Sequence, residues 1–189
     1  MSKINFNLLA FFILGVTVIS AQESVKYYFT NTGTLSFQSV APQEVISATS
    51  NEMRGLIDVE KKTFTFKVYI RSFKGFNSAL QAEHFNEKYL ESDKFPEAVF
   101  SGKIIEDVDL LKNGRHIIRA KGKLNIHGVE RERIIKSNIV ITDESVILDS
   151  QFIVMLSEHN IKIPKVVHEK IASEIAVSVK AVLRKKPAL

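Results

Sequence analysis

The sequence predicts an all-β domain, built either as a sandwich or as an up-and-down barrel. Three observations predict this class. Apolar and polar residues alternate with a period of two over most of the chain, turn residues separate these runs, and few segments have a helical pattern. Strands that follow one another through short turns favour the two architectures named. We find no internal repeat or linker, so we expect one domain over residues 22–189.

The first segment has the order of a secretory signal peptide. A short polar start carrying Lys3 precedes an unbroken apolar stretch over residues 8–19, and Ser20 and Ala21 are small residues just before Gln22. The stretch is shorter than the roughly 20 apolar residues of a membrane-spanning helix. We therefore expect residues 1–21 to be cleaved near Ala21, and the mature domain to be periplasmic or secreted.

The strands are expected to bury one face each. The candidate strands number roughly eight to ten and lie around Val25, Leu35, Ile46, Leu56, Phe66, Phe100, Ile118, Ile135, Val154 and Val177. The clearest apolar rows are Phe64, Phe66, Val68 and Ile70; Ile118, Ala120, Gly122, Leu124 and Ile126; Val146, Leu148, Ser150, Phe152, Val154 and Leu156; and Ile175, Val177, Val179, Ala181 and Leu183. Each row predicts side chains that point to the interior.

Turn signals divide these rows. They are Asn31-Thr32-Gly33, Asn113-Gly114 and His127-Gly128. An Asn-Gly pair is a strong signal for a two-residue hairpin. His127 is interpreted most simply as a hairpin residue that is hydrogen-bonded to local backbone.

Two segments are expected to be short helices. Residues 78–91 have a helical composition, with Asn77 or Ser78 as the N-cap, and Pro96 prevents continuation. On this helix Ala82, Phe85 and Tyr89 share one narrow face. A second helix is expected over residues 165–172, opened by Pro164, whose ring suits a first helical turn.

Composition limits the kinds of partner. The chain has no cysteine, so the fold must be held by its core alone, and 26 Lys+Arg against 21 Asp+Glu give a net charge of +5 that is scattered along the strands. Without a basic-aromatic stripe, we expect no nucleic-acid partner. Transient contact with the anionic headgroups of a membrane surface stays open. We expect a monomer or a weak dimer.

Catalytic and metal-binding patterns are weak. The five histidines have no close ligand spacing, and the position four residues after His168 is Ala172, so the second ligand of a zinc-protease helix is missing. Cysteine is absent, and no Gly-x-Ser-x-Gly motif occurs. We therefore expect no metal, no cofactor and no enzymatic activity.

Three separated blocks resemble the YceI-like family. They are residues 84–96 (HFNEKYLESDKFP), continued by residues 100–102 (FSG); residues 122–129 (GKLNIHGV), which resemble that family's strand and turn; and residues 160–164 (NIKIP). The resemblance implies an extended, lipocalin-like antiparallel β-barrel of about eight strands. It also implies a secreted or periplasmic protein that binds isoprenoid-type lipids in its interior.

The sequence therefore predicts a carrier of a long apolar molecule, such as an isoprenoid lipid or a quinone-like compound. Phe85 and Tyr89 are expected to close the mouth of the barrel, and His84, His159 or Lys162 to meet a polar headgroup. The expected ligand-binding residues are Phe64, Phe66, Val68, Ile70, Phe85, Tyr89, Ile118, Leu124, Phe152, Val154, Val177, Val179, His84 and His159. Two alternatives stay open: a metal-dependent enzyme that uses the same cavity, and an envelope structural protein with a solid barrel.

Overall fold

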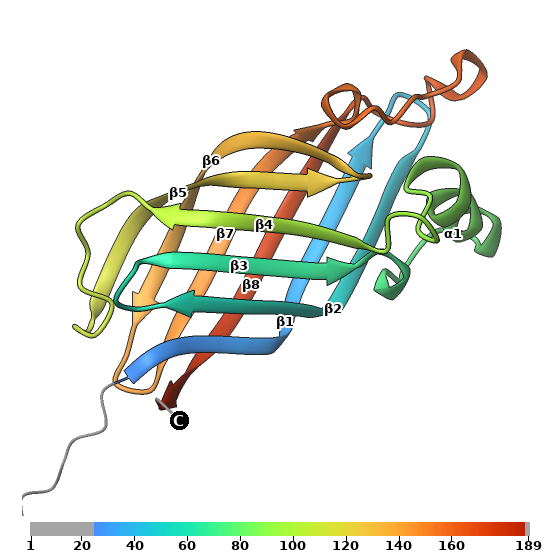
Figure 1. The fold of residues 1–189 in the computed structure, drawn as a ribbon. Helices are drawn as coiled ribbons and strands as arrows, with labels where there is room; N and C mark the ends of the chain where they lie inside the picture. Colours follow the sequence, from blue (N-terminus) through green and yellow to red (C-terminus); the bar gives the residue numbers. More distant parts are fainter. Residues whose placement is uncertain (1–24, 188–189) are drawn as a thin grey trace, which may run out of the picture.

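Eight strands close into one antiparallel barrel in simple chain order (Figure 1). The computed structural model describes residues 25–187, so the predicted signal peptide lies outside the described residues. The strands are β1 (Val25–Val40), β2 (Val45–Asp58), β3 (Thr63–Tyr69), β4 (Glu97–Ile104), β5 (Gly114–Ile126), β6 (Val129–Ile141), β7 (Ser145–Met155) and β8 (Glu174–Pro187). Because β8 also pairs with β1, the all-β barrel is confirmed and the sandwich is not.

The predicted helix at residues 78–91 is confirmed. It consists of α1 (Ala79–His84) followed by a π-helical turn at Phe85–Tyr89. It belongs to the connection from β3 to β4 and lies at one end of the barrel (Figure 1). The hydroxyl of Ser78 accepts a hydrogen bond from the backbone amide of Gln81 at 3.2 Å, so Ser78 is the N-cap. Short 3-10 turns occupy Ile70–Ser72 and Leu156–His159.

The second predicted helix, over residues 165–172, is wrong. Only a 3-10 turn forms, at Lys165–Val167, and Pro164 precedes that turn in an extended conformation. The amide of Ala172 donates to the hydroxyl of Ser39 on β1 at 2.8 Å. Because this backbone amide bonds to the barrel and not to a carbonyl within the segment, the segment does not continue as a helix.

The first predicted turn is also wrong, because Asn31-Thr32-Gly33 lies inside β1. The pairing of β1 with β2 shifts register on both sides of Gly33, which marks a β-bulge. Figure 1 shows β1 changing direction along its length. The two strand candidates around Val25 and Leu35 are therefore one strand, and those around Ile46 and Leu56 both belong to β2.

The hairpin prediction at His127-Gly128 is confirmed. These two residues alone connect β5 to β6, where Ile126 pairs with Val129. Both have positive φ angles, 53° and 72°, as a two-residue type I′ turn requires. Asn113-Gly114, by contrast, ends a longer connection between β4 and β5 and forms no two-residue hairpin.

A pair of glycines lets two central strands approach closely. Gly102 on β4 lies opposite Gly122 on β5. A Cβ atom on Gly122 would lie 2.2 Å from the carbonyl oxygen of Ser101, and one on Gly102 would lie 2.1 Å from that of Lys121. Real Cβ atoms do not come this close to backbone, so both positions require glycine.

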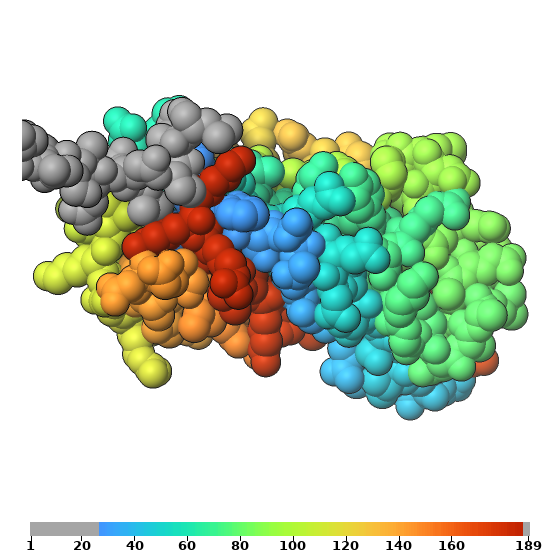
Figure 2. Space-filling view, turned by 90° about the horizontal axis from the view of Figure 1, so that it is seen from below, coloured from blue at the N-terminus to red at the C-terminus, as the bar shows by residue number. Residues whose placement is uncertain are grey.

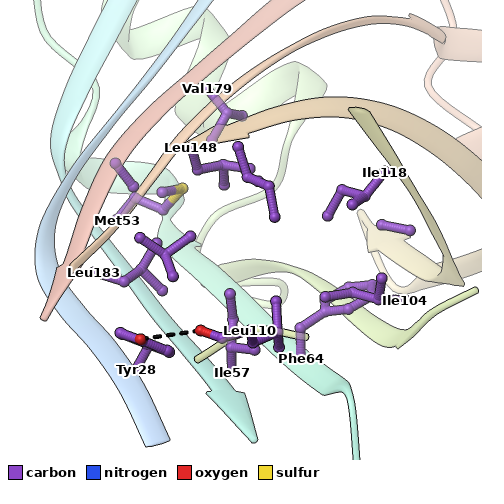
Figure 3. Packing of buried hydrophobic residues seen from close by; sticks show 14 of the residues in the cluster. Tyr28, Met53, Ile57, Phe64, Ile104, Leu110, Ile118, Leu148, Val179 and Leu183 are labelled. Atoms are coloured by element: carbon purple, nitrogen blue, oxygen red, sulfur yellow. Dashed lines mark hydrogen bonds between the residues drawn. The ribbon is translucent and has the colours of Figure 1, made fainter. Parts of the chain in front are cut away.

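The core fills the end of the barrel opposite α1. Tyr28, Leu110, Met53 and Leu183 are among its most deeply buried side chains (Figure 3). The hydroxyl of Tyr28 donates to the carbonyl oxygen of Leu110 at 3.1 Å, which fixes the β4–β5 connection across this end. In the space-filling view, α1 and that connection lie at opposite ends of an elongated molecule (Figure 2). Within residues 25–187, no helix is long and apolar enough to cross a membrane.

Candidate functional site

A cavity of about 510 Å³ occupies the end of the barrel that carries α1. Its wall combines inward-facing side chains of the strands with side chains from α1 and from the segment after β7. Most of this wall is apolar, and besides Ser39 the strand contribution comes from Leu35, Phe37, Ile46, Val68, Ala98, Leu124, Ile126, Phe152, Val154, Ile175 and Val177. The cavity offers a large apolar surface to a ligand and few polar groups.

Phenylalanine rings form the cover of this cavity. Phe85, in the π-helical turn, stacks on Phe37 of β1 with ring centroids 5.3 Å apart and an interplanar angle of 13°. Its ring also lies 5.0 Å from that of Phe76 and 5.7 Å from that of Phe73. All four rings line the cavity, so the contacts that hold the helix on the barrel also form the cavity wall.

Polar side chains lie at the rim. The Glu44 carboxylate, in the β1–β2 turn, accepts hydrogen bonds from the side chains of Gln81 at 2.8 Å and Asn77 at 3.3 Å. His84 lines the cavity, and its Nε2 lies 3.0 Å from Nζ of Lys88. Glu44, Gln81 and His84 thus present acceptors and donors next to the apolar interior.

A second cavity of about 100 Å³ lies deeper in the barrel. Five side chains line both cavities, and each comes from a different strand: Leu35 (β1), Val68 (β3), Ala98 (β4), Leu124 (β5) and Phe152 (β7). These five residues lie where the two cavities adjoin, and together they are called the collar. An eight-stranded barrel has room inside for its side chains or for one small ligand, so the size of the collar side chains bears on what can reach the deeper cavity.

Nearly all of the predicted ligand-binding residues line one of these cavities. Val68, Leu124 and Phe152 line both. The large cavity also contacts Ile70, His84, Phe85, Tyr89, Val154 and Val177, and the deep cavity contacts Phe64, Phe66, Ile118 and Val179. Of the residues expected to meet a headgroup, His159 and Lys162 line neither of the two described cavities, and Lys162 is exposed.

Other lining residues were not predicted. Phe37, Phe73 and Phe76 complete the cover, while Glu44 and Lys170 contribute charge. Phe73 and Phe76 lie between β3 and α1, where no alternation marks a buried face. The only sequence signal for them is their closeness to the predicted helix.

The three sequence blocks that resemble the YceI-like family meet at one corner of this end, where Leu90 and Ile161 share a buried cluster against which Ile126 packs. The ring of His127, in the β5–β6 turn, lies between two acceptors: the carbonyl oxygen of His159, 3.1 Å from Nδ1, and the Glu91 carboxylate, 2.9 Å from Nε2. Phe95 packs edge-on against the same ring with centroids 4.7 Å apart. His127 therefore bonds to distant segments, and its interpretation as a residue bonded to local backbone is wrong.

The electrostatics of this corner follow from burial and from close charges. Nδ1 of His159 donates to the carbonyl oxygen of Val129 at 3.0 Å. Burial lowers the pKa of His159, and this outweighs the hydrogen bonds to backbone carbonyls that raise it. Lys94 and then His127 lower the pKa of Glu91 by hydrogen bonding to its carboxylate. Burial raises the pKa of Tyr89, whose ring lines the cavity. This arrangement favours a charged Glu91 and a neutral His159.

Within residues 25–187, no group of three or more His, Cys, Asp or Glu side chains is placed to hold a metal ion. Ser39 is a buried polar residue that lines the large cavity, and its hydroxyl accepts a hydrogen bond from the amide of Ala172 at 2.8 Å. The chemistry that this site offers is enclosure of an apolar molecule.

Comparison with known proteins gives one family and several related folds. The family model described as the YceI-like domain matches residues 17–183. A polyisoprenoid-binding domain from Saccharophagus degradans, implicated in plant cell wall breakdown, has a similar structure with a TM-score of 0.72 and 11% sequence identity. That match covers 86% of this chain and 100% of the other.

Two further solved structures have the same fold. BcnA from Burkholderia cenocepacia is similar with a TM-score of 0.65 and 13% identity, over 80% of this chain and 95% of the other. The YCEI protein of Campylobacter jejuni gives a TM-score of 0.54 and 12% identity, with 100% of both chains covered. No curated protein matches this chain in sequence. At these identities the structural likeness shows the fold alone.

Proposed function

Because this chain belongs to the YceI-like family, we propose that it is a periplasmic or secreted carrier that holds one long apolar molecule inside its barrel. The proposed ligand class is an isoprenoid-type or quinone-like lipid. One structural neighbour supports this class, since the Saccharophagus degradans domain is described as polyisoprenoid-binding. Membership in a family of binding proteins also supports a carrier rather than an enzyme.

The observation that carries the proposal is the cavity beneath α1. Its volume of about 510 Å³ falls in the range of about 300–1,000 Å³ that is typical of small-ligand sites. Each methylene buried against its wall would contribute about 0.8 kcal/mol, so a long chain binds tightly without a polar contact. A hollow of this size also argues against an envelope structural protein with a solid barrel.

The proposal is tested by a bulky substitution on the inner face of β8, with the same substitution on the outer face of that strand as the control. Val177 lines the cavity, whereas its neighbour Ala176 is exposed on the outer face of β8. Organic extraction and native mass spectrometry of the wild-type protein from its native host should show a stoichiometric prenyl-type lipid. Val177→Trp should remove most of that lipid, and the matched control Ala176→Trp should retain it. Wild-type protein that carries no lipid would contradict the carrier function.

The proposed compartment has a separate test. The predicted signal peptide implies that the mature chain begins at Gln22. Intact-mass measurement of protein from the native host should give the mass of residues 22–189. Retention of Met1 would overturn the assignment to the periplasm or the exterior, without bearing on ligand binding.

A further inference from the structure

The polar groups of the two cavities are distributed unequally. The large cavity is lined by Glu44, Gln81 and Lys170, and it also contacts His84 and Tyr89 near α1. A ligand can place a polar group here, next to the rim, and find hydrogen-bond partners.

The deep cavity offers no comparable partner among the described residues. Its two serines are already bonded: Ser137 donates to Ser150 at 3.0 Å, and Ser150 donates to the carbonyl oxygen of Lys136 at 3.2 Å. Its remaining polar side chain, Lys67, pairs with Glu97 at 2.8 Å. Because burying an unpaired polar group is unfavourable, only an apolar end of a ligand is suited to this part of the barrel.

The far end of the barrel is closed. Tyr28, Met53 and Leu183 are almost fully buried there, and the hydrogen bond from Tyr28 to Leu110 fixes the connection across it. A chain that enters beside α1 therefore cannot leave through the other end. The length of such a chain is limited by the distance to this closed end and by the collar side chains on the way.

We propose that the protein selects single-headed amphiphiles by the length of their apolar tail, and that the collar sets that length. This inference rests on the proposed carrier function. The head stays at the rim near Glu44 and Gln81, and the tail extends toward the collar. Phe152 supplies the largest side chain of the collar, whereas Ala98 supplies the smallest, so substitutions at these two positions should shift the limit in opposite directions.

The test is a length series of prenyl alcohols offered to the delipidated mature protein. Farnesol, geranylgeraniol and solanesol compete against a dansyl-labelled farnesyl probe, and the affinity of each is measured at equilibrium. Wild type should bind the shorter alcohols and bind solanesol at least about tenfold more weakly. Phe152→Ala should remove most of that penalty. Ala98→Leu should weaken geranylgeraniol by at least about tenfold while leaving farnesol bound.

Controls separate the collar from the carrier function. Ala176→Leu adds the same bulk to the outer face of β8 and should leave the series unchanged. Leu35→Ala enlarges the collar from another strand and replaces Phe152→Ala if that variant does not fold. Equal binding of all lengths in every variant would overturn the collar and leave the carrier function intact. A wild-type protein that binds none of the alcohols would overturn both.

Discussion

Truncating Phe85 tests whether the helix at the mouth of the barrel retains the ligand. The Phe85 ring contacts Phe37, Phe73 and Phe76, with centroids 5.0 to 5.7 Å away. Each aromatic pair contributes about 0.5–1.5 kcal/mol beyond the area that it buries. A fully buried Phe→Ala change costs about 3–5 kcal/mol, and since Phe85 is only partly buried we expect a loss of about 2–3 kcal/mol.

This loss of packing free energy should raise the rate of ligand release. If the contacts hold the closed state, a loss of about 2–3 kcal/mol speeds opening by about 30- to 150-fold, since 1.4 kcal/mol corresponds to a factor of ten. The assay follows a dansyl-labelled prenyl probe, preloaded into the protein, as it dissociates into excess unlabelled farnesol. Phe85→Ala should release the probe faster by this factor.

The matched control is Phe95→Ala. The Phe95 ring packs on His127 and does not line the cavity, so this variant should lose stability without faster release. Chemical denaturation of both variants gives the stability loss. If Phe85→Ala loses stability but releases the probe at the wild-type rate, the helix serves packing alone.

Substitutions at three other positions have expected outcomes of their own. Burial lowers the pKa of His159, so the folded chain binds fewer protons than the unfolded chain, and the free energy of unfolding should fall as pH drops below about 6.5. The denaturant midpoint should therefore fall less between about pH 7.5 and about pH 5.5 in His159→Gln than in wild type. An equal fall in the two proteins contradicts this role of His159. Gly122→Ala should lower the free energy of unfolding by about 2–3 kcal/mol, because its Cβ would collide with the backbone of Ser101. Lys121→Ala, on the exposed face, should change that free energy little, and urea unfolding measures both variants. His84 lies beside Lys88 at the rim, so His84→Ala should weaken the binding of a prenyl phosphate but not that of the matching alcohol in the displacement assay. Equal weakening of binding for both ligands would exclude a headgroup contact.

The alternation of apolar residues predicted the barrel wall well. Rows such as Phe64 to Ile70 face inward because a strand that buries one face must alternate, and this depends only on local sequence. The same argument could not distinguish the bulge at Gly33 from a turn. Both disrupt regular pairing and favour glycine, and only pairing with β2 and β8 shows that β1 continues.

The site was less predictable where it depends on distant contacts. The failed helix at residues 165–172 has a suitable composition, but the amide of Ala172 bonds to Ser39, far away in sequence. Likewise, His159 has the residue type of a headgroup ligand, yet its ring is buried against the β5–β6 turn. Glu44 became part of the rim only because α1 folds back onto the β1–β2 turn.

The helix over the cavity is attached to the barrel at both of its ends. Its last residues lead into the corner where Glu91 bonds to His127 and where Leu90 is buried. Its first turn is held to the barrel through the part-buried hydrogen bond from Gln81 to Glu44, and the preceding Asn77 donates to Glu44 and to the carbonyl oxygen of Val45. The side-chain bonds at both ends are separate from the backbone ladder of the barrel, so displacing α1 would leave the pairing of all eight strands intact.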